Sequence, residues 1–415
     1  MSDTDARPNQ TFSWQQTFAS LKYRNYRLWF YGQMISLFGT WMQSAAQGFL
    51  VFELTRSPLY LGYVTFASGI PTWLFSLYSG VVADRVSRRT LLVATQTAMM
   101  ILAFILAALT ALHLVQPWQI VALAFLLGIA NAFDAPARQA FVLEMVERED
   151  MANAIALNSS MFNISQVVGP AAGGLTYALL GPAWCFTLNG ISFIAVIVGL
   201  LMMVIRPQAA PPRRASLHAD LGEGLRYVLG HEVIRALIGL VGVTSLFGMS
   251  FVTLIPAWTV DVLRGGSAMN GLLLAARGVG AVISALTIAG LVHSRIKGQL
   301  LTLGSLAFPV VLLLFAMVRW LPLALLLLVL IGIGQVLVLN LANILVQEQA
   351  ADELRGRVMG IYSLIFLGLM PVGGLLAGAM AERIGEPATV ILGGAVSLAF
   401  AIAAWLFLPR LRALE

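Results

Sequence analysis

A dense group of charged side chains lies between two long apolar runs, from Gly80 to Arg89. It contains one carboxylate and three guanidinium groups, on Asp84, Arg85, Arg88 and Arg89. Charges at this density are too costly to bury in hydrocarbon, so the stretch is expected to form a short hairpin at a membrane face. Gly80, at its start, would allow two helices to approach closely, and the charges would fix the side of the bilayer on which the hairpin lies.

A second group of chemically useful side chains is a polar stripe in the first apolar segment. Steps of three and four residues place the stripe on one face of a helix, and polar groups in hydrocarbon need a partner. The stripe is expected to line a substrate cavity, with hydrogen bonding between helices as the alternative. Its members are Gln33, Ser36, Thr40, Gln43, Ser44 and Gln47.

Arg277 is the one charged residue well inside an apolar segment. It is expected to hold an anionic substrate in the cavity, or to pair with a carboxylate such as Glu53 or Asp261. The alternative is that its long side chain reaches the outer headgroups.

Carboxylates that could exchange protons stand only at the ends of the apolar segments. The candidates are Asp134, Glu53 and Asp261, and Asp134 is the best of them on the inner side, because Asn131 and Arg138 lie one helical turn away on either side. The alternative for Asp134 is a helix cap or a gate ion pair after the fourth segment.

Enzyme chemistry is not indicated. A phosphate-binding loop needs Gly-Lys followed by Ser or Thr, whereas Lys22 and Lys297 follow Leu21 and Ile296. The sequence also lacks a zinc-protease motif, a Gly-x-Ser-x-Gly elbow and a cysteine-based metal site, since Cys185 is the single cysteine. No cofactor and no metal are therefore expected.

Composition places the chain in a membrane. Hydrophobic residues make up 59% and charged residues 11%, against about 25% charged in soluble proteins. Apolar runs of membrane-spanning length recur throughout, and they predict an all-α protein of twelve transmembrane helices. These begin near Trp29, Tyr60, Leu91, Gln119, Ala154, Cys185, Ala236, Gly271, Leu300, Leu321, Val358 and Ala388.

Basic residues predict the orientation. With an even number of helices both termini share one side, and the cytoplasm is the side that receives most Lys and Arg. The exceptions among the 25 basic residues are Arg56, Arg264, Arg277, Arg319 and Arg383. The net charge of +6 thus reflects membrane topology, and no nucleic-acid partner is expected.

The expected domains are two bundles of six helices on either side of a polar break. The break begins with a proline-rich linker and continues as an amphipathic helix from Leu217, predicted to lie on the inner surface. The boundaries are 1–28 for a cytoplasmic tail, 29–205 for the first bundle, 206–234 for the linker, 235–408 for the second bundle and 409–415 for a second tail.

The second half repeats motifs of the first. The hairpin is echoed from Gly290 to Gln299, and the run Gly169-Pro170-Ala171-Ala172-Gly173-Gly174 is echoed by Pro371-Val372-Gly373-Gly374. Such repetition around one break is typical of a transporter built from two pseudo-symmetric bundles.

These residues resemble the major facilitator superfamily. Its signature Gly-x-x-x-Asp-Arg-x-Gly-Arg-Arg is matched by Gly80, Asp84, Arg85, Arg88 and Arg89, with Ser87 where glycine is usual. In that family the aspartate caps the eleventh helix, here expected near Gly356, and acts as a conformational gate. Gly169, Pro170, Gly173 and Gly174 resemble the antiporter signature, which implies tight packing of helices five and eight on the outer side; Ala156 and Ser165 replace its earlier glycines.

A narrower resemblance, to enterobactin-exporter-like proteins and drug:proton antiporters, covers almost the whole chain. It rests on Ser36–Gln43, Asp134–Phe141 and Leu221–Tyr227. It implies a monomeric exporter of the bacterial inner membrane that exchanges an amphipathic small molecule, such as a siderophore or drug, for protons. The alternatives are an uptake symporter of the same fold, and a transport-inactive scaffold or lipid scramblase.

Overall fold

The computed structural model describes residues 18–204, 217–291, 296–408 and 410 of the chain. In these ranges all regular structure is helical, as the sequence predicts. The first half contains a short 3-10 helix, η1 (Ala19–Lys22), and six long helices. These are α2 (Arg24–Thr55), α3 (Pro58–Arg85), α4 (Arg88–Ala111), α5 (Pro117–Val142), α6 (Met151–Leu180) and α7 (Pro182–Met202).

The second half begins with α8 (Leu217–Gly230) and a segment that starts as α9 (Glu232–Val243). That segment is interrupted by π turns at Thr244–Gly248 and Trp258–Val262, a 3-10 turn at Ser250–Leu254 and the short α10 (Ile255–Ala257). The remaining helices are α11 (Ser267–Leu291), α12 (Lys297–Met317), α13 (Leu321–Gln349), α14 (Arg355–Ile384) and α15 (Glu386–Phe407).

Nine helical segments in the described residues are long and apolar enough to cross a membrane. They comprise α4, α5, α7, the broken segment Glu232–Val262, and α11 to α15. α2, α3 and α6 are of similar length, with 32, 28 and 30 residues. Together these elements are consistent with the predicted twelve spans, and the chain is a multi-pass membrane protein.

Matching turns at one end of the molecule reveal the repeat. Gly181 ends α6 and Gly385 ends α14, with positive φ angles of 89° and 82°. A proline stands in the first turn of the helix that follows each glycine. Glycine adopts this backbone conformation without strain, and proline fits a helix start, so each pair reverses the chain abruptly.

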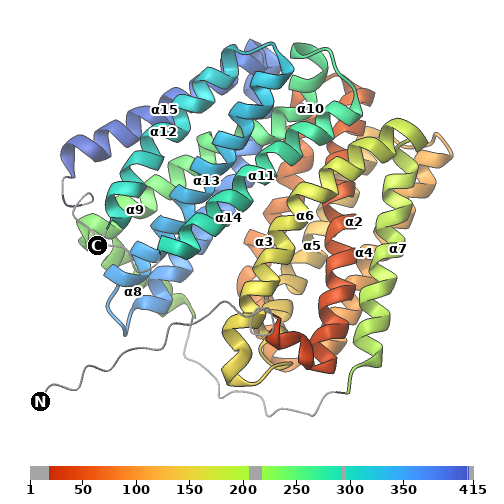
Figure 1. Ribbon diagram of the computed structural model, residues 1–415, viewed down its shortest axis with the longest axis horizontal. Coiled ribbons are helices and arrows are strands. Elements are labelled where there is room, and N and C mark those ends of the chain that lie inside the picture. Colours follow the sequence, from red (N-terminus) through yellow and green to blue (C-terminus); the bar gives the residue numbers. More distant parts are fainter. Residues whose placement is uncertain (1–17, 205–216, 292–295, 409, 411–415) are drawn as a thin grey trace, which may run out of the picture.

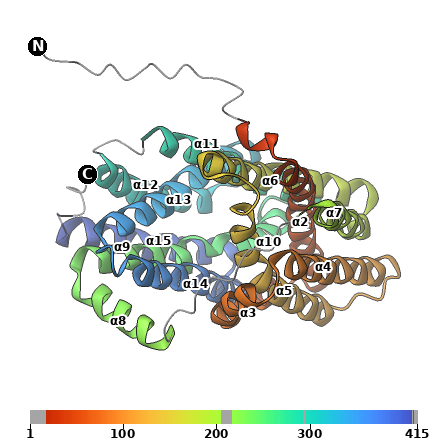
Figure 2. The ribbon, with the colours of Figure 1, turned by 90° about the horizontal axis from the view of Figure 1, so that it is seen from below.

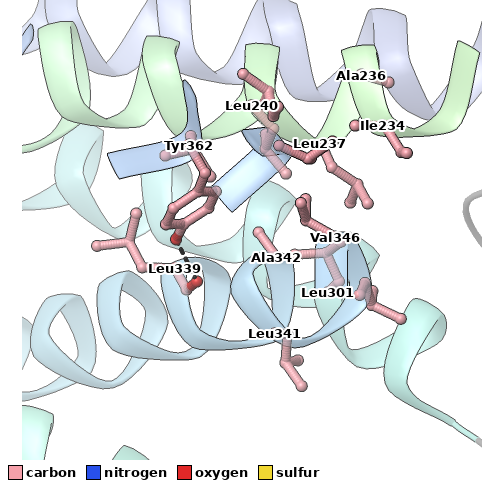
Figure 3. Close-up of a cluster of buried hydrophobic side chains, with 14 of the residues drawn as sticks. Ile234, Ala236, Leu237, Leu240, Leu301, Leu339, Leu341, Ala342, Val346 and Tyr362 are labelled. Atoms are coloured by element: carbon pink, nitrogen blue, oxygen red, sulfur yellow. Dashed lines mark hydrogen bonds between the residues drawn. The ribbon is translucent and has the colours of Figure 1, made fainter. Parts of the chain in front are cut away.

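The two halves stand side by side and lean together at the end that carries these turns (Figures 1 and 2). Each half has its own apolar core. In the second half, α9, α12, α13 and α14 enclose a cluster that includes Leu237, Leu301, Ala342 and Val346 (Figure 3). Tyr362 on α14 enters this cluster and donates a hydrogen bond to the carbonyl of Leu339 at 3.0 Å.

Two segments near the predicted domain boundaries pack against the bundles. The helix expected from Leu217 is present as α8, and it is docked on α14: Glu223 pairs with Arg357 at 2.7 Å, and Gly224 packs on Arg357 and Ile361. η1 and the first turn of α2 lie within the predicted tail 1–28, yet Ser20 is buried and its backbone amide donates to Asn153 at 3.0 Å. The first bundle therefore begins before residue 29.

Candidate functional site

Glycines join the two halves at one end of the molecule. Gly174 on α6 faces Gly271 on α11, and a Cβ added to Gly174 would lie 2.9 Å from the Cα of Gly271. Gly378 on α14 faces Gly62 on α3 in the same way, and a Cβ added to Gly378 would lie 3.0 Å from the Cα of Gly62. Because neither crossing has room for a side chain, the backbones of the two halves are in direct contact there.

α6 and α14 also pack on helices of their own halves, through other glycines. Gly169 and Gly173 on α6 lie against Phe38, Trp41 and Met42 of α2. The signature glycines thus divide by helical face: Gly174 and the carbonyl of Pro170 meet α11, whereas Gly169 and Gly173 meet α2. In the second half Gly373 likewise packs on Leu246, in the broken segment of its own half.

One polar contact reinforces the α3–α14 crossing. The Glu382 carboxylate accepts hydrogen bonds from the Ser57 hydroxyl at 2.7 Å and from the backbone amide of Leu59 at 3.3 Å. These donors belong to the N-cap residue and the first turn of α3, where amides lack partners within the helix. A carboxylate of the second half therefore caps a helix of the first half.

The opposite end of the molecule lacks such packing. A Cβ added to Gly80 of α3, to Gly290 of α11, or to Gly356 or Gly360 of α14 would meet no atom within 4 Å. The ion pairs Arg88–Glu144, Lys297–Glu348 and Arg357–Glu223 each join helices of the same half. The halves are thus packed together at the glycine crossings and diverge toward the end that carries the charged hairpin (Figure 1).

The hairpin residues are tied into the first half. Arg88 pairs with Glu144, beyond the end of α5, and Arg89 donates to the Leu201 carbonyl at 2.7 Å. Ser87 caps α4 by accepting a hydrogen bond from the Thr90 amide at 3.2 Å. Arg85 is exposed. The Asp84 side chain lies outside the described part of the structure, so its expected contact with the start of α14, at Arg355, is a prediction.

The second half repeats the Arg88–Glu144 contact. Lys297, the first residue of α12, pairs with Glu348 near the end of α13 at 2.5 Å. Residues 292–295 of the echoed hairpin lie outside the described ranges. The ion pair nevertheless shows that both halves fasten the helix after the hairpin to the end of the next helix.

The α2 stripe is mostly buried. Gln33, Ser36, Gln43 and Gln47 are buried, whereas Thr40 is half-buried and bonds the Ser36 carbonyl of its own helix. Gln43 accepts a hydrogen bond from Asn189 of α7 at 2.7 Å. This contact joins two helices, which is the alternative to lining a cavity. Gln33 differs, because its Oε1 is buried without a partner among the described residues.

Arg277 lies on α11 and contacts neither carboxylate that the sequence proposed for it. Its Nη1 donates to Gln335 of α13 at 3.4 Å, and its Nε is buried without a partner in the described part of the chain. Pairing with Glu53 or Asp261 is therefore wrong for this conformation. Gln335 could not be placed opposite Arg277 from the sequence, because residue spacing along one helix does not give the rotation of its neighbour.

Asp134 is not a helix cap. It lies inside α5, which continues to Val142 despite Pro136, and it is 1% exposed. Its carboxylate accepts from Thr95 and Gln96 of α4 at 3.0 and 2.9 Å and faces Arg138 at 3.4 Å. The predicted Arg138 partner is confirmed, whereas the partners on α4 were missed. The contacts with Thr95 and Gln96 hold α4 on α5.

The other two carboxylate candidates lie near the closed end. Glu53 is exposed on α2 and accepts a hydrogen bond from the hydroxyl of Tyr177, a buried residue of α6. Asp261 is exposed in the π turn before α11. Neither carboxylate forms an ion pair with another residue that the structure describes.

An ion pair outside the membrane-spanning segments fastens η1 to the start of α6. Lys22 lies 2.6 Å from Asp150, which also accepts from the Tyr23 hydroxyl at 2.8 Å. The hydrogen bonds from Lys22 and Tyr23 lower the pKa of Asp150 below its ordinary value. The bond to Asp150 raises the pKa of Lys22.

Comparison with known proteins agrees with this architecture. The chain is 28% identical over 381 residues to the multidrug efflux pump Tap of Mycolicibacterium fortuitum, covering 88% of this chain and 91% of that protein. It is 26% identical over 405 residues to the enterobactin exporter EntS of Escherichia coli O81, covering 96% of each. A bacterial homologue of the human lysosomal transporter Spinster, solved in an inward-facing and occupied conformation, shares the fold with a TM-score of 0.74 at 13% identity, covering 94% of this chain and 98% of that one.

The family assignment follows from the extent of the match as well as from the paired halves. The profile described as transmembrane secretion effector matches residues 15–415, nearly the whole sequence. The chain therefore belongs to the transmembrane secretion effector family of major facilitator transporters.

Proposed function

We propose that this chain exports an amphipathic small molecule across the bacterial inner membrane, by alternating access and in exchange for protons. The observation that carries the proposal is the asymmetry between the two ends: glycine crossings join the halves at one end, while Gly80, Gly290, Gly356 and Gly360 at the other end have no atom within 4 Å of an added Cβ. Two bundles that meet at one end only can rock so that the open end closes and the closed end opens.

The basic residues give this asymmetry a direction. They gather at the open end, which the positive-inside rule assigns to the cytoplasm together with both termini. The conformation would then accept cargo from the cytoplasm. Export, in place of uptake, is supported by relatives named as a multidrug efflux pump and an enterobactin exporter.

Proton exchange is the part of the proposal that needs a carboxylate able to lose its proton and regain it. Asp134 is poorly suited, because its carboxylate is buried and already engaged by Thr95, Gln96 and Arg138. Glu53 is better suited, since it is exposed, bonds a phenol and has no cation to release among the described residues. We assign the coupling role to Glu53, with Asp261 as its control.

The experiment compares inside-out membrane vesicles with and without an acidified interior. An exporter accumulates a catecholate siderophore, or another amphipathic substrate, in such vesicles only when the interior is acidic. An uptake symporter would instead release preloaded compound from these vesicles when their interior is acidified. The scaffold or scramblase alternative predicts no accumulation, and lipid exchange between leaflets in the absence of any gradient would support the scramblase.

The hairpin has a testable role in the same cycle. With the open end closed, Asp84 would reach the start of α14 and stabilise the outward-facing state. An Asp84→Asn variant should keep its fold and lose most accumulation. Full accumulation by this variant would remove the hairpin from the mechanism.

A further inference from the structure

Arg277 bears a charge that no carboxylate balances in the described part of the chain. Its recorded hydrogen bond, to Gln335, is long at 3.4 Å, and the buried Nε has no partner among the described residues. A charge held away from water is costly unless it is paired, so an unbalanced arginine in this position requires a function or a missing partner.

The faces of α11 determine where Arg277 points. Leu272, Val279, Ile283 and Leu286 form the exposed apolar face of this helix. At 100° per residue, Arg277 lies on the opposite face, away from the surface that lipid would cover.

The two residues that stand seven positions before and after Arg277 share its face. Asn270, on one side, donates a hydrogen bond to the Ala45 carbonyl of α2 at 3.5 Å, so this face of α11 looks toward the other half. Ser284, on the other side, is 1% exposed, and its hydroxyl has no partner in the described residues. On the hairpin side of the Gly271 crossing, therefore, the face of α11 that carries Arg277 and Ser284 is directed to the interior between the halves, and both side chains have polar atoms without a partner among the described residues.

Gln335 completes a set of donors. Its Oε1 accepts from Arg277, and its amide nitrogen, beside the guanidinium, has no hydrogen-bond partner among the described residues. Gln335 is 3% exposed and stands in an otherwise apolar turn of α13, where Gly332 brings the two helices into contact at the Arg277 carbonyl. The amide side chain is therefore held in place next to the arginine by close backbone packing.

We propose that Arg277 and Gln335 form a subsite for an acidic oxygen of the exported cargo, either a carboxylate or an ionised phenol. The inference rests on the proposed function, because a transported molecule is what would reach this face of α11. A guanidinium presents a planar fork of donors that matches two oxygens, and the neighbouring amide adds another donor. A cation would be repelled and would leave the guanidinium unpaired, so the site selects for negative charge.

The test is direct binding of two dyes that share a ring system and differ in charge. Fluorescein is an anion at pH 8 and rhodamine 123 is a cation, and fluorescence anisotropy reports the affinity of each for the purified protein in detergent. The wild-type chain should bind fluorescein more tightly than rhodamine 123. Arg277→Gln should weaken fluorescein binding by about tenfold to a hundredfold, the range expected for losing a charge-assisted hydrogen bond, and should leave rhodamine 123 unaffected or tighter.

Matched variants separate the subsite from folding and from net charge. Arg383→Gln removes one positive charge from an exposed position at the closed end and should bind fluorescein as the wild type does. Arg277→Lys keeps the charge without the planar fork and should recover only part of the affinity, while Gln335→Leu should lose less than Arg277→Gln. If Arg277→Gln does not fold, the fluorescein affinities of Arg277→Lys and Gln335→Leu, compared with that of the wild type, test the subsite.

Two results would overturn the subsite: no preference of the wild type for fluorescein, or equal fluorescein affinity in the wild type and every Arg277 and Gln335 variant. Failure of the proposed export function would give a different result from failure of the subsite. In that case anion binding through Arg277 would persist while vesicles accumulated no compound under any gradient.

Discussion

Gly174 on α6 and Gly271 on α11 meet so closely that neither can carry a side chain: a Cβ on Gly271 would lie 2.8 Å from the Cα of Gly174. This crossing joins opposite halves, and Gly378 and Gly62 repeat it on the other side of the molecule. The two crossings are therefore the contacts that must separate when the closed end opens.

A methyl group at the first crossing should favour the open state of that end. Gly174→Ala forces the α6 and α11 backbones apart, and overpacking of this kind costs about 1–3 kcal/mol. Ser267 is 8% exposed at the crossing, so a cysteine there, with Cys185 replaced by serine, reports opening through its rate of maleimide labelling. Gly174→Ala should label faster than the parent.

Gly266→Ala is the matched control, because a Cβ at Gly266 meets no atom within 4 Å. Equal labelling of Gly174→Ala and Gly266→Ala would show that the crossing does not control the closed end.

The Glu382 carboxylate should act as a latch on the second crossing. Glu382→Ala removes the acceptor for Ser57 and Leu59, whereas Glu382→Gln retains one oxygen. Opening of this end, measured by spin-label distances between the ends of α3 and α14, should increase in the order wild type, Glu382→Gln, Glu382→Ala. A Ser57→Ala change made on top of Glu382→Ala should add little, since both remove the same contact. Additive effects would argue against a direct latch.

Asp134 should matter for stability more than for proton coupling. Asp134→Asn weakens its hydrogen bonds with Thr95 and Gln96 and leaves Arg138 without its counter-ion. The expected loss is about 1–3 kcal/mol, since Arg138 is partly exposed and can be solvated. Thermal unfolding in detergent should therefore shift to lower temperature, while the protein that remains folded keeps pH-dependent transport. Normal stability with loss of the pH dependence would make Asp134 the coupling residue instead.

The pH should control the docking of η1 through Asp150. Because the folded-state pKa of this carboxyl is lowered, its contribution is complete above the ordinary aspartate value of about 3.9 and disappears as the pH falls through the lower folded value. Hydrogen exchange of residues 18–23, corrected for intrinsic rates, should be constant from about pH 6 to 9 and rise in strong acid. Asp150→Asn should exchange rapidly across the whole range, and a protected segment in that variant would contradict the assignment.

Much of the fold follows from the sequence because long apolar runs, prolines and glycine turns are local signals. The helix expected from Leu217 is present, and the turns at Gly181 and Gly385 stand just before the predicted helix starts near Cys185 and Ala388. The starts of the long helices were predicted less well, since polar first turns such as Arg24–Arg27 extend beyond the apolar run. The π turns between Thr244 and Val262 have no clear sequence signal apart from Pro256.

The candidate site shows the limit of sequence reasoning more sharply. Spacing correctly separates the faces of one helix, but it does not reveal which neighbour each face meets. Gly169 and Gly174 belong to one motif yet contact different helices, and Arg277 faces Gln335 in place of a carboxylate. Gln335 could have been found as the polar residue within the apolar run from Ile331 to Leu339, although its partner could not.

The most direct test of proton-coupled export uses inside-out vesicles with an acidic interior and a pH-sensitive dye. Adding a transported compound should release protons from wild-type vesicles and from Asp261→Asn vesicles, because antiport exchanges one for the other. Glu53→Gln vesicles should release none, while still equilibrating the compound down its own gradient. Accumulation of the compound without proton release, or full release by Glu53→Gln, would contradict the account: the first rejects proton antiport and the second rejects Glu53 as its carrier.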